Sequence, residues 1–96
     1  MKLVVVVYEA GVDDSVTELL GKLGVSGWTK LEGATGMGHK GLRLGTPIWP
    51  GTNNVLLVAM DEQGLLPFLD ALEDLKREYR KPPAVFAFVV PVEAVR

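Results

Sequence analysis

The 96-residue sequence has no cysteine and a single histidine, and these absences exclude several chemistries. Without cysteine there is no disulfide, no thiolate nucleophile and no thiolate metal site. The single histidine, His39, has no partner in the sequence that would orient it as a catalytic base, so no triad is indicated. We therefore do not expect an enzyme.

The sequence also lacks runs of one charge and long apolar segments. The net charge is −2, and acidic and basic residues are mixed along the chain, so nothing favours a nucleic-acid partner. The apolar run Leu3–Val7 is too short to span a bilayer, which argues against membrane insertion. It also lacks the cleavage region of a signal peptide, and we expect a cytoplasmic protein.

Apolar residues are abundant for so short a chain. They make up 48% of the sequence, and the mean hydropathy is +0.24. A chain of this length forms one small core, so we expect a single domain over residues 1–96. The apolar surface that this core cannot hide predicts self-association.

Four segments are predicted to form β-strands. The first contains a continuous β-branched run without polar alternation, and the third is nearly all apolar. The four segments cover Lys2–Tyr8, Trp28–Ala34, Asn53–Asp61 and Ala84–Val90.

Two segments predict amphipathic helices. The first, Asp14–Leu23, begins after Asp13 or Asp14 as a candidate N-cap and ends before Gly24, a position suited to a left-handed residue. The second is expected to start near Gln63, because a proline such as Pro67 is tolerated only in the first turn. Its inner face is predicted to hold Leu65, Phe68, Leu69, Leu72, Leu75 and Tyr79.

The order of these elements is βαβ followed by βαβ, which predicts the α+β class. With both helices on one face of a four-stranded antiparallel sheet, the result is a ferredoxin-like βαββαβ sandwich. The other face of the sheet would be bare and apolar, so a second copy is expected to cover it.

The connection Gly36–Thr52 is expected to be a long loop without secondary structure, and loops of that kind are usually functional. Its glycines either permit a path with positive φ or form a backbone anion site together with Lys40 and Arg43. Ile48 and Trp49 either pin the loop to the rest of the protein or anchor a partner protein.

Two stretches resemble the PII signal-transduction proteins. The sequence VDDSVTELLGKLGVSGWTKLEGATGMGHKG is similar to the first third of that family, and VFAFVVPVEAVR is similar to its last strand and P-V-E tail. The resemblance implies a PII-like homotrimer with ligand clefts between subunits. It also implies a long loop that contacts partners such as an enzyme or a membrane transporter.

In that family the cleft binds ATP or ADP, and Thr29, Gly36 and Gly38 match cleft positions. The Gly-rich phosphate-binding turn of the family is replaced here by Lys81–Pro82–Pro83–Ala84. Proline has no backbone N–H, so a phosphate nest is not expected at this turn. The identity of the ligand is left open, whether a nucleotide or another anion.

A second hypothesis is a metal-binding protein of the CutA type, which shares the trimeric ferredoxin-like plan. The candidate ligands are Glu32, Met37 and His39, with Glu9 nearby at the base of the loop. Three-fold symmetry would multiply any one of them.

Overall fold

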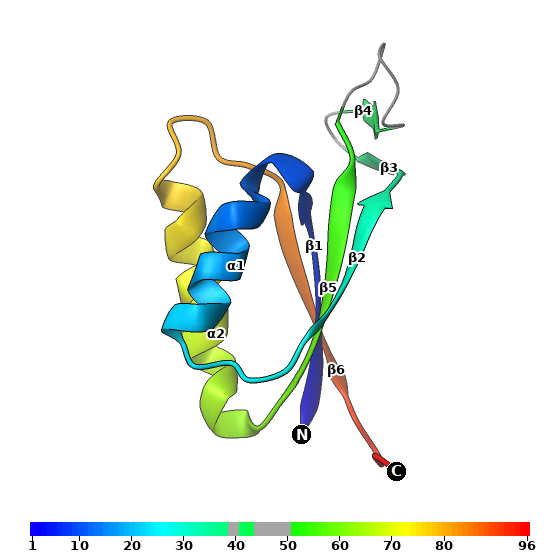
Figure 1. The fold of residues 1–96 in the computed structure, drawn as a ribbon, viewed down its shortest axis with the longest axis vertical. Helices are drawn as coiled ribbons and strands as arrows, with labels where there is room; N and C mark the ends of the chain where they lie inside the picture. The colour runs from blue at the N-terminus through cyan, green and yellow to red at the C-terminus, as the bar shows by residue number, and fades with distance from the viewer. Residues whose placement is uncertain (39–40, 44–50) are drawn as a thin grey trace.

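The structure is a computed structural model that describes residues 1–38, 41–43 and 51–96 (Figure 1). In chain order its elements are strand β1 (Lys2–Glu9), a 3₁₀ turn (Ala10–Val12), helix α1 (Asp13–Lys22), strands β2 (Thr29–Ala34), β3 (Gly36–Gly38), β4 (Gly41–Arg43) and β5 (Asn53–Met60), helix α2 (Glu62–Arg77) and strand β6 (Val85–Pro91).

Four of the strands form one antiparallel sheet in the order β2-β5-β1-β6. The first strand therefore lies at the centre, and its partners come from the second half of the chain. Both helices cover the same face of the sheet (Figure 1). This confirms the predicted ferredoxin-like sandwich of the α+β class.

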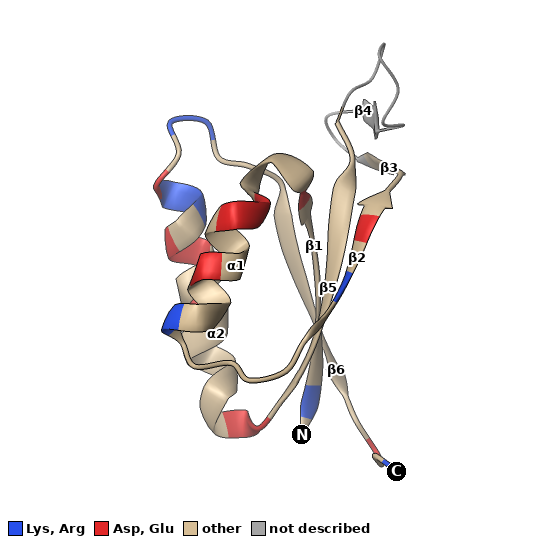
Figure 2. Ribbon diagram, in the orientation of Figure 1, with Lys and Arg blue, Asp and Glu red and all other residues tan. Residues whose placement is uncertain are grey.

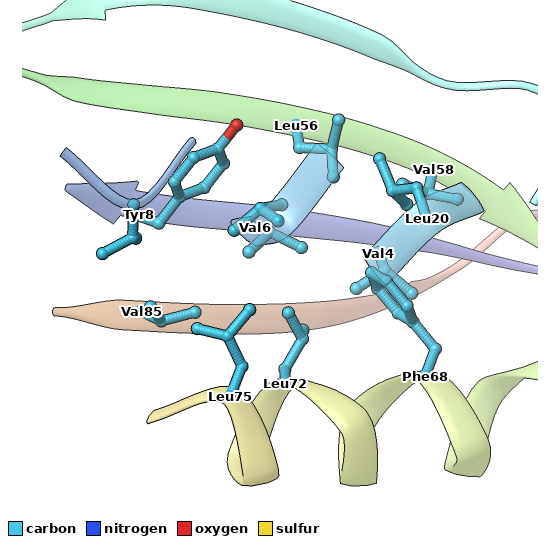
Figure 3. Close-up of a cluster of buried hydrophobic side chains, with 12 residues drawn as sticks. Val4, Val6, Tyr8, Leu20, Leu56, Val58, Phe68, Leu72, Leu75 and Val85 are labelled. Atoms are coloured by element: carbon cyan, nitrogen blue, oxygen red, sulfur yellow. The ribbon is translucent and has the colours of Figure 1, made fainter. Parts of the chain in front are cut away.

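The core lies between the sheet and the two helices. Alternate residues of β1 (Val4, Val6 and Tyr8) point to the helices and are fully buried. Figure 3 shows them packed with residues of β5, β6 and both helices, and Phe68 of α2 lies against Val4. The helices supply one apolar stripe each, as their spacing predicts.

Neither α1 nor α2 covers the opposite face of the sheet (Figure 1). The strand register shows which residues lie on this face, because paired residues point to the same side of the sheet: Val5 pairs with Leu57 and Phe88, and Val7 pairs with Val55. We call this surface the open face, and its residues are Leu3, Val5, Val7, Thr29, Leu31, Val55, Leu57, Ala59, Phe86, Phe88 and Val90. It is almost wholly apolar, as the lack of polar alternation in the strands predicts.

Charged side chains are distributed very differently from this apolar surface. They gather on the helices and near the strand ends, and β5 and β6 carry none (Figure 2). Among the described residues no helix is long and apolar enough to cross a bilayer.

The start of α1 differs from the prediction. Its N-cap is Val12, which makes no side-chain cap, and Asp13 is already the first helical residue. The carboxylate of Asp13 does not cap the helix because it is bonded to side chains of the sheet. At the other end Gly24 has φ +68°, as predicted.

Helix α2 also departs from the prediction, because Pro67 is its sixth residue and not part of the first turn. The proline removes the bond that its nitrogen would give to the carbonyl of Gln63. Pro67 is exposed, so water can hydrate that carbonyl and the helix continues. Asp61 is the N-cap, and its Oδ1 accepts a hydrogen bond from the Gly64 N–H at 3.0 Å.

The connection between β2 and β5 was expected to lack secondary structure, and this is wrong for its first part. Strands β3 and β4 pair as an antiparallel ribbon, with Gly36 opposite Arg43. Among the described residues the positive φ angles fall at Gly24 and Gly33, so Gly36 does not need a positive φ. Its place in an extended ribbon explains why.

Candidate functional site

Several chain connections meet at one end of the sheet. The Ala10 N–H donates to the Thr52 carbonyl at 2.9 Å, and the Glu9 N–H donates to the Ala84 carbonyl at 3.0 Å. This joins the end of β1 to the segment before β5 and to the segment before β6. The ribbon β3–β4 leaves the sheet at the same end (Figure 1). A ligand bound at this end of the sheet could therefore contact several connections of the chain at once.

The residues predicted to bind a ligand do not all converge within one chain. Thr29 is exposed at the start of β2, opposite Leu57. Gly36 begins β3, past the far end of β2, roughly 20 Å away if the strand rise of about 3.3 Å per residue is applied. Gly38 ends β3, and Arg43 ends β4. Within one chain, Thr29 therefore lies far from Gly36 and Gly38.

Other predicted residues are placed only in part. Met37 is 77% exposed in β3, and Glu32 is exposed on β2. His39, Lys40, Ile48 and Trp49 lie outside the described residues, so their assignments to anion, metal or partner binding stay predictions. Among the residues that the structure describes, no three acidic or histidine side chains form a group that could hold a metal ion.

The turn before β6 has a distinctive pattern of backbone donors. Pro82 and Pro83 have no N–H, and the N–H of Ala84 donates to Glu9 Oε1 at 2.9 Å. Where the family has a glycine-rich turn, this chain therefore has two prolines followed by an N–H that a carboxylate already engages. An anion at this turn would therefore find its backbone donors missing or already used.

A network of polar side chains lies beneath the same end of the sheet, centred on Asp13. Its Oδ1 accepts from the Tyr8 hydroxyl at 2.6 Å and from Asn54 Nδ2 at 3.2 Å. Lys30 Nζ lies 3.0 Å from each of the two Asp13 oxygens. The network thus joins β1, α1, β2 and β5.

Burial and hydrogen bonding shift two pKa values in this network. Burial, and then the hydrogen bond to Asp13, raises the pKa of the Tyr8 hydroxyl above its usual value. Partial burial pushes the pKa of Asp13 upward, but the donors Tyr8, Lys30 and Asn54 outweigh it, so the pKa lies below its usual range. At neutral pH the network holds a neutral phenol and a charged carboxylate.

This network was not predicted from the sequence, although a signal was present. Tyr8 and Asn54 are the buried residues with polar groups on the helix-facing side of β1 and β5, where the neighbouring buried residues are apolar. Lys30 occupies the corresponding side of β2, opposite Leu56. A polar group on a buried face needs a partner, and this requirement points to Asp13 as the common acceptor.

The two shifted pKa values predict a loss of stability at both extremes of pH. The folded-state pKa of Asp13 is lowered, so its contribution is present above about pH 4 and is lost as the pH falls further. The folded-state pKa of Tyr8 is raised, so its contribution is present below about pH 10 and is lost above it.

Urea unfolding at pH 9, 10 and 11 measures the alkaline branch. The free energy of unfolding should fall by up to about 1.4 kcal/mol per pH unit above pH 10 for each proton that only the unfolded chain releases. Tyr8→Phe should be less stable than the wild type at pH 9, and it should show a flatter decline above pH 10. Parallel declines for the two proteins would contradict the role of Tyr8.

Taken together, the fold and this end of the sheet define a class: a ferredoxin-like α+β module with a β-ribbon extending from the connection between its second and third sheet strands. The family model of the nitrogen regulatory protein P-II matches residues 1–96. The chain belongs to the P-II family, whose members are regulatory proteins.

Solved structures of PII-like proteins share this fold. CPII from Thiomonas intermedia K12, a nitrogen regulatory PII-like protein in complex with ADP, AMP and bicarbonate, is 21% identical with a TM-score of 0.72 over 97% of this chain and 88% of its own. A putative PII-like signaling protein from Thermus thermophilus is 28% identical with a TM-score of 0.67, covering 92% and 82%. No curated protein matches the sequence significantly.

Proposed function

We propose that this chain is a PII-like regulatory protein that forms a homotrimer and binds a small anion at the clefts between subunits. It would contact an enzyme or a membrane transporter through residues 36–52. The match to the P-II family over the whole chain carries the proposal.

The open face supports the trimer. Phe86 and Phe88 of β6 are more than half exposed there in the single chain, and so is Leu31 of β2 at the other edge of the sheet. Exposure of this much contiguous apolar surface is unfavourable for a monomer in water. Packing three open faces around a common axis would remove it from solvent, and it would bring Thr29 of one chain towards the loops of its neighbour.

The turn before β6 narrows the class of ligand. CPII is seen with ADP, AMP and bicarbonate, and we infer that this chain favours the less highly charged of such anions. A polyphosphate would find no N–H at Pro82 and Pro83, and the N–H of Ala84 already donates to Glu9. Bicarbonate and AMP should therefore bind better than ADP, and ATP should bind worst.

A thermal-shift screen of the wild-type protein with bicarbonate, AMP, ADP, ATP and phosphate tests this proposal. A ligand at 100 times its Kd should stabilise the fold by about 2.7 kcal/mol, which is a rise of several degrees in Tm. Lys40→Ala and Arg43→Ala should each reduce the rise. Lys22→Ala, at the opposite end of α1 and in an exposed pair with Glu18, should leave it unchanged.

The same screen with Cu(II), Zn(II) and Ni(II) separates the two hypotheses for the loop base. Stabilisation by one of these metals, together with its loss in His39→Ala and no response to any anion, would support the CutA type of function and contradict the anion site.

A further inference from the structure

Strand β2 is attached weakly at the end that leads into the ribbon. It pairs with β5 through Thr29, Lys30 and Leu31, and the register then shifts before pairing resumes at Ala34. Within this break Gly33 has φ +75°, a backbone conformation that favours glycine. Since β2 is an edge strand, it has no second neighbour in the sheet to hold the break in place.

A side chain of β5 supports the break. Asn54 is 3% exposed, and its Oδ1 accepts from the Gly33 N–H at 3.4 Å. The other end of the same amide donates to Asp13 Oδ1 at 3.2 Å. Because both ends of the Asn54 amide are engaged, the position of Asp13 determines where the acceptor for Gly33 lies.

A second link runs from Asp13 to β2 through Lys30. The Lys30 side chain is 14% exposed, and its ammonium also donates to Thr17 of α1 at 3.3 Å. The same ammonium lies 5.3 Å from the ring centroid of Trp28, just before β2. Asp13 is therefore linked to β2 at two places, through Lys30 before the break and through Asn54 at Gly33 within it.

We propose that Asp13 is a positioning residue that sets the direction in which the β3–β4 ribbon leaves the sheet. Tyr8 fixes the carboxylate from β1, and Lys30 and Asn54 transmit its position to the break in β2. Gly36 lies three residues beyond Gly33, so a shift of the break would move the base of the ribbon. Any effect of this direction on ligand or partner binding rests on the proposed function.

Hydrogen–deuterium exchange of the ligand-free protein tests the claim. In Lys30→Met the amides of residues 29–38 should exchange about tenfold faster than in the wild type, because a charge-assisted hydrogen bond holding that segment is lost. The amides of β1 and α2 should exchange at the wild-type rate. Lys22→Met removes a lysine of α1 whose pair with Glu18 is exposed, and it should leave residues 29–38 unchanged.

Two results would overturn the proposal. One is an unchanged rate at residues 29–38 in Lys30→Met, and the other is a uniform acceleration throughout the protein, which would mean that the network contributes only to global stability. Tyr8→Phe, which removes one oxygen and keeps the ring, provides a second variant. Because it also lowers the global stability, its residues 29–38 should be accelerated more than the amides of β1 and α2. Because no ligand is present, this outcome is independent of whether the proposed anion site exists.

Discussion

Phe88→Glu is expected to convert the proposed trimer to a monomer while leaving the fold of each chain intact. In the single chain Phe88 is 58% exposed on the open face, so a glutamate there costs little in the isolated subunit. In a trimer the same carboxylate would be desolvated without a partner, and symmetry would repeat it three times. A buried unpaired charge costs several kcal/mol, which exceeds what most interfaces tolerate.

Light scattering at micromolar concentration provides the measurement. The wild type should have about three times the 10.4 kDa mass of one chain, and Phe88→Glu should have the mass of one. Leu66→Glu is the matched control, since Leu66 is 66% exposed on α2, away from the open face. It should keep the wild-type mass. A monomeric wild type, or a trimeric Phe88→Glu, would show that the open face does not form the interface.

Phe68→Ala should have the largest effect on stability among substitutions in α2. Phe68 is 1% exposed and lies in the cluster with Val4, Leu20 and Val58 (Figure 3). Truncation removes most of a buried ring and leaves a cavity between the helices and the sheet. Such substitutions cost about 3–5 kcal/mol, a large share of the roughly 5–15 kcal/mol that a domain has in total.

Urea unfolding at one fixed protein concentration measures this loss, because assembly makes apparent stability depend on concentration. Leu66→Ala is the control on the same helix, and its exposed side chain should change the free energy of unfolding by less than about 0.5 kcal/mol. Similar losses for the two variants would mean that α2 does not pack through the face described above.

The order of the elements and the class of fold follow from local pattern alone. Strand β1 is a β-branched run, which predicts a strand, and α2 carries its apolar residues at intervals of three and four, which predicts a helix. Each pattern therefore identified the type of its element. The resemblance to the PII proteins drew on the same local stretches. The apolar residues of the open face were also predictable, because a strand without polar alternation has an apolar side facing away from the helices.

The candidate site was predictable only in part, and the reason is the sequence distance between its members. Asp13 resembles a helix cap when only its neighbours are considered, yet its acceptor oxygen is bonded to Asn54, 41 residues away. The break in β2 and the positive φ of Gly33 likewise depend on pairing with β5. Hydrophobic periodicity indicates which face of each element is buried. The sequence by itself therefore determined that the helices and the sheet pack as a ferredoxin-like sandwich. The choice of hydrogen-bond partner depends on which faces meet, and only the tertiary structure decided that Asp13 joins strands of the sheet instead of capping its own helix.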